Sequence, residues 1–552
     1  MDVGQKRLNQ LLSWGVGLVT VFITPWFSYD PLNVPRVMLL LVVAWIAFFL
    51  ILPKLKVHIL REYRFLVAVL LLFMVQMILV IIIAPGDKGQ QFFGAGGRHT
   101  GFLAYTALVI MAIAAAISSS EQLLTLAVRS IGVAGSLSIL YGLFQSVGLD
   151  PIGWTNRYSP VIGFFGNPNF QAAFVGISAS AISVFALVGE ISKVWKALSL
   201  LYVILALYVI YGTQSLQGFL VYAIGTGAAV VVFFFKTERL RKFRFLVLTA
   251  GFVSVLGIAL DILQKSPWKS ILYAESVSSR GDFWRAGWRM ALDHPFFGVG
   301  LDSYRDWYYR NRDAVAASRL DGANYTDSGH NILVDFLANG GFPLVLIYLG
   351  LIVLALISAI KVLKRMEKFD PYFVSIFVVW VGYQAQSLIS INQISLAIWG
   401  WFTSGLIIGY EINSRDKNNP KPAGKSAKSK QSANFSVGVF AGLVVGLGLG
   451  LPAFLADTNF RSSIDSLNIE RVNSSAYKWP QDVIRMNYVS RLFEQNKLPD
   501  RALVVARAAV ISYPENFEAW SILYNLASTP EDEKLAALKK MKELNPYAPE
   551  LQ

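Results

Sequence analysis

Thirteen apolar runs, each long enough to cross a lipid bilayer, constrain the fold of this chain more than any other feature. A helix needs about 20 apolar residues to span the hydrocarbon core. Because no water reaches that core, the backbone must satisfy its own hydrogen bonds there, and a helix does so within one segment. The sequence therefore predicts an all-α, polytopic bundle of about thirteen spans. The runs cover residues 11–27, 37–53, 65–84, 101–118, 123–147, 169–188, 197–213, 219–235, 245–263, 332–360, 371–390, 393–412 and 434–456.

The composition fits a membrane protein and excludes several kinds of site. Hydrophobic residues make up 55% of the 552 residues and charged residues only 15%, against about 25% in soluble domains. The absence of cysteine excludes disulfides, thiolate metal ligands and cysteine nucleophiles. The four histidines are scattered, and the charged loop described below contains no Asp-x-Asp pair. We therefore expect no metal site and no cofactor.

The basic residues give the chain an orientation. The net charge is +14, and much of the excess lies in five loops on the same predicted side. The positive-inside rule assigns these loops, and the N-terminus with them, to the cytoplasm. Topology and contact with anionic lipids account for the charge, so we expect no nucleic-acid partner. The five loops are residues 54–64, 191–196, 236–244, 361–368 and 415–430.

This orientation places two large segments outside the membrane, a loop at about 264–331 and the C-terminal region 457–552. We expect a membrane domain over residues 1–456, in which a Lys- and Ser-rich cytoplasmic linker at 413–432 precedes a Gly-rich last span. The C-terminal region is predicted to be soluble and helical. Its Pro-marked breaks resemble tetratricopeptide repeats, and an unrelated small helical bundle is the alternative.

The run from Ile332 to Ile360 is longer than one span needs. Asn339-Gly340-Gly341 and Pro343 interrupt it, so a kink or a short half-helix is expected there.

The loop from Ser278 to Tyr304 is charged and aromatic, so it cannot lie in lipid and is the expected place for chemistry. Ser279 and Asp282 have the spacing of a capping box, which predicts a helix that starts beside Arg280. A guanidinium at a helix N-terminus is suited to bind a phosphate. The alternative is an interfacial helix whose arginines contact lipid headgroups. We expect one apolar face made by Phe283, Trp284, Trp288, Ala291 and Leu292, with Arg285 and Arg289 on a polar face.

Further polar residues stand next to the predicted spans. His330 precedes an apolar helix, and an imidazole with its usual pKa near 6.5 acts as a general base near neutral pH. A role in capping that helix is the alternative. Gly-rich backbone near an arginine binds anions or simply turns the chain. The candidates of this kind are Arg98 in residues 91–102, and Arg157, Asn167 and Asn169 in residues 154–174.

Four of these elements together resemble the O-antigen ligase and O-antigen polymerase superfamily, over roughly residues 90 to 410. They are Arg280-x-x-x-Trp284, the turn from Asp293 to Gly300, His330-Asn331 followed by Gly340-Gly341, and Gly166-Asn167-Pro168-Asn169. The combination is fairly specific for the superfamily, although no single motif is.

The resemblance implies a metal-independent, inverting glycosyltransferase of the GT-C type in the bacterial cytoplasmic membrane. Such enzymes move a glycan from a polyprenyl diphosphate, such as undecaprenyl diphosphate, to an acceptor hydroxyl on the outer face. The acceptor is a lipid or protein in a ligase and another glycan in a polymerase. Carried over by position, His330 activates the acceptor and Arg280 holds the departing diphosphate. Gln217 stands where family members often carry an arginine, and Arg98 or Arg157 is a candidate replacement.

Three other functions stay open at this point. The C-terminal helices suggest a protein partner, so an O-linked protein oligosaccharyltransferase is the nearest alternative. A lipid-linked glycan transporter or flippase is a different class, which predicts ionisable groups inside the spans and inverted repeats. The spans are mostly apolar at their centres and no such repeat is evident. A membrane scaffold predicts that Arg280→Ala and His330→Ala are tolerated.

Overall fold

The computed structural model describes residues 3–154, 156, 159–188, 191–245, 249, 251, 275–318, 325–415, 428–548 and 551, and every regular element in these ranges is a helix. Twelve of the thirteen predicted runs coincide with long helices, and the remaining run, 245–263, lies almost entirely outside the described residues. Eight of the twelve are long and apolar enough to cross a membrane. The twelve are α1 (Val3–Val21), α2 (Asn33–Ile51), α4 (Arg64–Ile83), α6 (Phe102–Ile117), α7 (Glu121–Ser146), α8 (Pro168–Leu187), α9 (Lys193–Gly212), α10 (Leu216–Lys236), α16 (Ile332–Arg365), α17 (Pro371–Ser387), α18 (Ile394–Asn413) and α19 (Lys428–Asp465).

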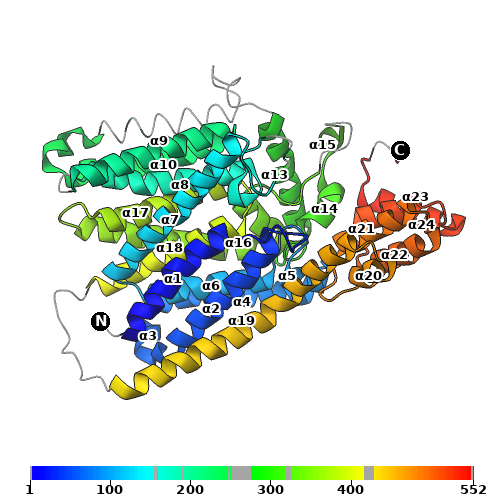
Figure 1. The fold of residues 1–552 in the computed structure, drawn as a ribbon, viewed down its shortest axis with the longest axis horizontal. Coiled ribbons are helices and arrows are strands. Elements are labelled where there is room, and N and C mark those ends of the chain that lie inside the picture. Colours follow the sequence, from blue (N-terminus) through cyan, green and yellow to red (C-terminus); the bar gives the residue numbers. More distant parts are fainter. Residues whose placement is uncertain are drawn as a thin grey trace.

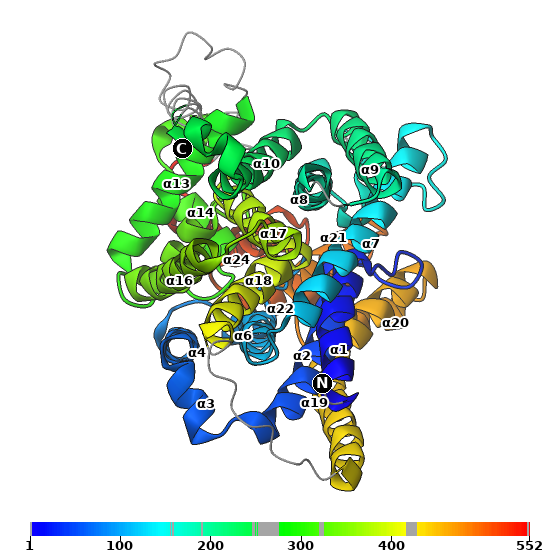
Figure 2. The same cartoon turned by 90° about the vertical axis from the view of Figure 1, so that its left-hand side faces the viewer.

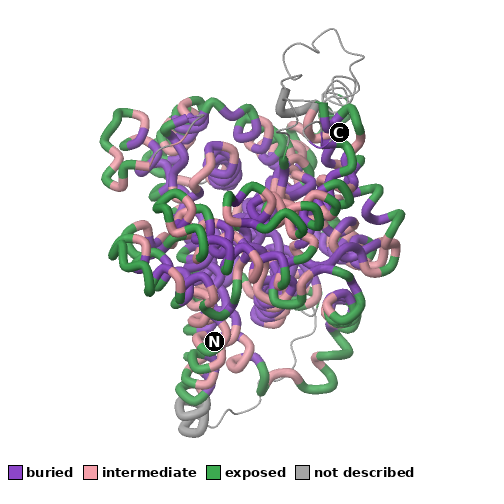
Figure 3. Tube along the Cα trace, turned by 90° about the vertical axis from the view of Figure 1, so that its right-hand side faces the viewer, coloured by how far each residue is buried: buried purple, intermediate pink, exposed green. Residues whose placement is uncertain are grey.

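The core of the bundle lies around α18. This helix is buried along nearly its whole length, and its side chains Trp399, Trp401 and Phe402 are among the largest fully buried ones. Figure 2 shows α18 near the middle of the bundle, and Figure 3 shows that buried residues are concentrated in the middle. The outer helices α4 and α9 instead expose apolar side chains such as Leu71 and Leu200. Exposed apolar faces of this size fit contact with lipid, so the chain is a multi-pass membrane protein.

Helix α16 breaks where Gly340, Gly341 and Pro343 predict a break. Gly341 has φ 73° and ψ −177°, so its backbone is not helical, and Pro343 follows it. A Cβ on Gly341 would lie 2.5 Å from the carbonyl oxygen of Pro295. The backbone freed by the break bonds to the preceding loop, since the amides of Val299 and Phe342 donate to the oxygens of Ala338 and Pro295. The kink therefore fastens the loop after α13 to α16.

The connections at one end of the bundle lie beside the C-terminal helices (Figure 1). These connections include α5 (Lys88–Phe93), α13 (Glu275–Asp293), α14 (Tyr304–Asn311) and α15 (Ala314–Ser318). The N-terminus and α3 (Val57–Glu62) lie at the opposite end. The two large segments predicted to share a side of the membrane thus share an end of the bundle. Short 3-10 helices complete the described loops at Leu52–Lys54, Gly163–Phe165 and Glu238–Phe243.

Helix α19 carries the C-terminal region and packs closely on α2. Every fourth residue of its apolar part is a glycine, and a Cβ on Gly442 or Gly446 would lie 2.3 Å from the Cα of Ile46 or 2.6 Å from the Cα of Val42. The predicted use of glycine for close helix contact is confirmed. The helix continues through residue 457, the predicted domain boundary, without a break.

The C-terminal region is helical, as predicted. Ala502, Ala506 and Ala509 are all buried in its core, beside Met486 and Phe493. Successive helices pack against one another as hairpins, whereas their membership in a tetratricopeptide repeat stays a prediction. The helices are α20 (Ile469–Ala476), α21 (Val483–Gln495), α22 (Pro499–Ser512), α23 (Phe517–Asn525) and α24 (Glu531–Leu544).

Candidate functional site

Helix α13 begins earlier than predicted. It starts at Glu275, so Ser279 is not its N-cap and Arg280 lies in its second turn rather than beside a free N-terminus. The capping-box prediction was wrong because the residues before Ser279 continue the helix. Arg280 therefore gains nothing from unpaired backbone N–H groups, and its role depends on its surroundings instead.

The single apolar face predicted for α13 is also wrong. At 100° per residue, Trp288 lies about 140° and Leu292 about 180° from Phe283 around the helix. Phe283 is buried, whereas Trp288 and Leu292 are 50% and 56% exposed. The buried side faces α14, where the hydroxyl of Tyr304 donates to the carbonyl oxygen of Phe283 at 2.5 Å. The helix thus has a buried face toward the protein and an outward face with Trp288.

His330 sits in a tight turn that its neighbours hold in place. Its φ of 52° lies in the left-handed region, which non-glycine residues seldom adopt. Asp335 accepts hydrogen bonds from the Ser328 hydroxyl at 2.9 Å and from the Gly329 amide at 2.7 Å. Asn331 then caps α16 by accepting from the Leu333 amide at 2.9 Å. A strained residue that its surroundings hold so firmly is typical of a functional position.

A charged pair joins this turn to a loop more than two hundred residues earlier in the chain. Arg98 donates to both oxygens of Asp327, from Nε at 2.8 Å and from Nη2 at 2.5 Å. Arg305 of α14 adds a second cation 3.6 Å from the same carboxylate. Although burial raises it, the pKa of Asp327 is held well below its usual range by these two arginines. Asp327 is therefore a fixed negative charge.

The imidazole of His330 lies in a surrounding that keeps it neutral. Its ring contacts the ring of Phe283, with centroids 5.3 Å apart. Burial, followed by the charge of Arg98, lowers the pKa of His330 to about 4, and Arg280 contributes in the same direction. The Ser328 carbonyl oxygen lies 3.3 Å from Nδ1. A proton on Nδ1 is therefore favoured, which leaves the lone pair on Nε2 free to accept a proton.

Arg280 differs in its ion pairing from the other arginines near the His330 turn. It lies three residues before Phe283, on the same side of α13, and Phe283 contacts His330. Burial lowers the pKa of Arg280. Within the part of the chain that the structure describes, no carboxylate forms an ion pair with it. A half-buried cation without a countercharge is suited to receive an anion.

The other two arginines of α13 are engaged with acidic residues. Arg285 pairs with Asp282 at 2.5 Å and with Asp313 at 3.0 Å, and Arg289 lies 3.6 Å from Asp313. These pairs hold α13 against the start of α15. Arg98, the predicted substitute for the family arginine, is likewise committed to Asp327.

Asn167, Asn169 and Gln217 lie at the starts of α8 and α10. Asn167 caps α8 by accepting from the Asn169 amide at 2.8 Å, and Asn169 accepts from the Ser215 hydroxyl at 2.7 Å. Gln217 is buried, and neither atom of its amide has a hydrogen-bond partner among the described residues. Arg157 lies outside the described residues. Asn167 and Asn169 therefore shape the backbone, whereas Gln217 keeps free donors and acceptors.

Sequence reasoning missed Asp327, Asp335 and Arg305 as parts of the site. The nearness of Asp335 to the Ser-Gly-His turn was a local signal, because a carboxylate one turn inside a helix reaches back to its N-terminal side. No local signal links Arg98 or Arg305 to Asp327. In the described ranges, no three His, Asp or Glu side chains are grouped so that they could hold a metal ion.

Comparison with known proteins relates part of the chain to a known family. A family model described as O-antigen ligase matches residues 201–349, from within α9 to within α16. The matched stretch includes Gln217, Arg280, His330 and the break at Gly341, whereas Arg98 and the C-terminal helices lie outside it. No curated protein matches the chain. The matched stretch is thus similar to the O-antigen ligase family, over less than a third of the chain.

Proposed function

We propose that this protein transfers a glycan from a polyprenyl diphosphate carrier to an acceptor hydroxyl, as a surface-polysaccharide ligase or polymerase. The reaction is metal-independent and inverting, and it takes place on the outer face of the bacterial cytoplasmic membrane, with the N-terminus in the cytoplasm. One observation carries the proposal. A neutral His330 lies beside a half-buried Arg280 that has no countercharge among the described residues.

The two side chains fit the two ends of a displacement at the sugar. Nε2 of His330 accepts the proton of the acceptor hydroxyl, whose oxygen forms a bond to the anomeric carbon. The bond from that carbon to the diphosphate oxygen breaks, and its electron pair leaves with the diphosphate. Arg280 stabilises the charge that develops there without moving a proton. Attack from the face opposite the leaving group inverts the anomeric centre.

The electrostatics of the site couple these two events. Without substrate, the charges of Arg98 and Arg280 add to burial in lowering the pKa of His330. A bound diphosphate offsets that positive charge and raises the pKa of His330 toward neutrality. A general base works best when its pKa lies near the working pH. The donor thus improves the base that activates the acceptor.

A protein acceptor is the second candidate, because the C-terminal helices contact the candidate site through α14. Asn516 donates to Asp306 at 2.8 Å, and the ring centroids of Tyr309 and Phe517 lie 5.2 Å apart. An O-linked protein oligosaccharyltransferase would use such helices to present its acceptor. Transfer to a protein hydroxyl requires the same His330 and Arg280, so the product separates the two candidates.

The test is glycan transfer in proteoliposomes supplied with polyprenyl-diphosphate glycan and a panel of lipid, protein and glycan acceptors. We expect His330→Ala to lower transfer about 100-fold to 10,000-fold, the usual contribution of a general base. His58→Ala is the matched control, because His58 is exposed on α3 at the opposite end. Equal transfer by wild type and His330→Ala would remove His330 from the mechanism.

A further inference from the structure

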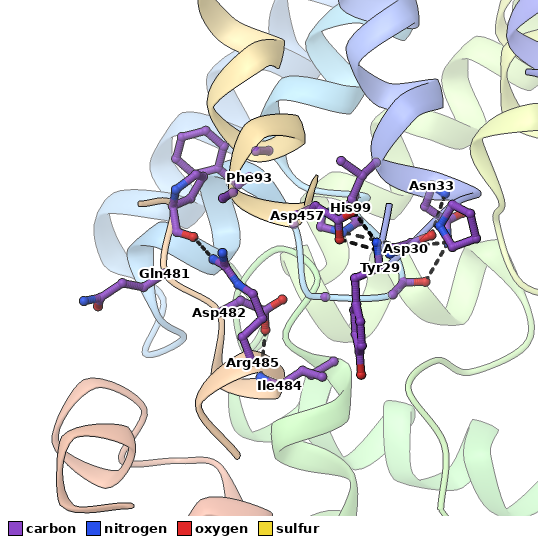
Figure 4. Close-up of a pocket in the computed structure, with 18 residues that line it drawn as sticks. Tyr29, Asp30, Asn33, Phe93, His99, Asp457, Gln481, Asp482, Ile484 and Arg485 are labelled. Atoms are coloured by element: carbon purple, nitrogen blue, oxygen red, sulfur yellow. Dashed lines mark hydrogen bonds and ion pairs between the residues drawn. The ribbon is translucent and has the colours of Figure 1, made fainter. Parts of the chain in front are cut away.

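A cavity lies between the membrane helices and the C-terminal region, apart from the His330 turn. It has a volume of about 300 Å³, at the lower end of the range for small-molecule sites. Four segments line it: the start of α2, the loop after α5, the middle of α19 and the start of α21 (Figure 4). Trp479 of the C-terminal region contacts Phe93, the last residue of α5, with ring centroids 5.1 Å apart.

The loop from Gly94 to Thr100 separates this cavity from the His330 turn. Arg98 extends from one side of the loop to Asp327, whereas Gly96 and His99 line the cavity on the other. Gly96 packs closely on the C-terminal region, because a Cβ there would lie 2.4 Å from Oδ2 of Asp482. The cavity and the His330 turn therefore share one short stretch of backbone.

Carboxylates dominate the polar lining of the cavity. Asp457 accepts from the amides of Tyr29 at 2.8 Å and Asp30 at 3.0 Å, and Asp482 accepts from the Ile484 amide at 2.8 Å. Asp30 lies 3.7 Å from Nε2 of His99. Asp30 also accepts from the amides of Leu32 and Asn33 and from the side chain of Asn33. A carboxylate has about four acceptor sites, so Asp457 and Asp482 keep acceptor capacity for hydroxyl or amine donors.

Arg485 supplies an unused donor inside the same cavity. Its side chain is 6% exposed, and Nη2 donates to the carbonyl oxygens of Lys478, at 3.0 Å, and of Pro480. Nη1 has no hydrogen-bond partner in the part of the chain that the structure describes. A buried guanidinium nitrogen without a partner costs free energy, so it indicates a group that completes it.

We propose that this cavity binds one sugar ring that carries no acidic group, as a subsite for the glycan that the enzyme transfers or extends. A sugar presents hydroxyls at its edge and C–H bonds on its faces. Asp457, Asp482 and Arg485 can hydrogen-bond the hydroxyls at the edge. Phe93, Val34 and Ala453 can pack against the C–H bonds of a face. Three carboxylates against one guanidinium disfavour a diphosphate. Assignment of the sugar to the transferred glycan rests on the proposed function, whereas sugar binding itself does not.

The test is saturation-transfer NMR on the full-length protein in detergent with free glucose, galactose, N-acetylglucosamine and glucuronate. We expect saturation of at least one uncharged sugar and none of glucuronate. Asp482→Asn keeps the cap of α21, since asparagine caps as well as aspartate, and Ala453→Phe fills the cavity. Each is expected to weaken binding at least fivefold. Asp465→Asn, an exposed residue outside the cavity, should change nothing.

Absence of saturation for every sugar would overturn the proposal, as would binding that both variants leave unchanged or equal binding of glucuronate. His330→Ala separates this proposal from the proposed function. The variant should keep sugar binding and lose glycan transfer. Sugar binding by a wild-type protein that transfers no glycan would support the cavity and contradict the proposed function.

Discussion

The middle of the bundle and the end that holds His330 satisfy their polar groups in different ways. In the middle, helices such as α18 make their backbone hydrogen bonds within themselves and bury mainly apolar side chains, with Ser395, Thr403 and Ser404 buried among them. At the His330 end, the backbone is broken or strained, and pairs of charged side chains far apart in sequence, such as Arg98 and Asp327, hold it. The first arrangement tolerates lipid, and the second fixes charges around a reacting group. The contrast predicts which substitutions lower glycan transfer and which lower the stability of the fold.

Arg280→Ala gives the largest expected effect at the His330 end. The loss of the charge that faces the leaving group should lower glycan transfer about 100-fold to 1000-fold. Because Arg280 has no ion-pair partner in the described residues, the temperature of thermal unfolding should fall little. Transfer assays and thermal unfolding in detergent measure the two effects. Arg61→Ala, at an exposed position on α3, is the control. A large loss of stability would make Arg280 a structural residue.

Asp327→Asn should instead affect stability first. The change leaves the buried Arg98 without its countercharge, and breaking such a pair costs about 3 kcal/mol. Thermal unfolding and denaturant titration measure this loss. Asp465→Asn breaks an exposed pair with Arg461 and should cost less than about 1 kcal/mol. Similar losses for the two variants would show that the Arg98–Asp327 pair does not hold the turn.

Gly341→Ala tests the break in α16 with a smaller effect. Alanine at φ 73° is strained, and its Cβ would meet the carbonyl oxygen of Pro295. We expect a loss of about 1–3 kcal/mol in unfolding free energy. Gly350→Ala in the same helix is the control, because the nearest neighbour of its Cβ would be 3.9 Å away. A neutral Gly341→Ala would mean that α16 straightens without harm to the loop after α13.

The contrast between the middle of the bundle and the His330 end also explains which features could be predicted from the sequence. Apolar runs predicted the long helices, and Gly340-Gly341 with Pro343 predicted the break, because both depend on local backbone physics. Ser279 to Asp282 looked like a helix start, yet the helix begins at Glu275, because a capping pattern does not prevent helix on its N-terminal side. The partners of Asp327 come from residues 98 and 305, and such contacts between distant loops leave no pattern in one sequence.

The pH dependence of glycan transfer tests the central claim, that a neutral His330 is the base. Because kcat/KM reports the free enzyme, it should stay level from about pH 5 to 8 and fall as His330 is protonated near its pKa of about 4. The acid limb of kcat should lie at higher pH, because bound diphosphate raises the pKa of His330. An acid limb of kcat/KM near 6.5, or a limb near 4 that persists in the residual activity of His330→Ala, would contradict the account.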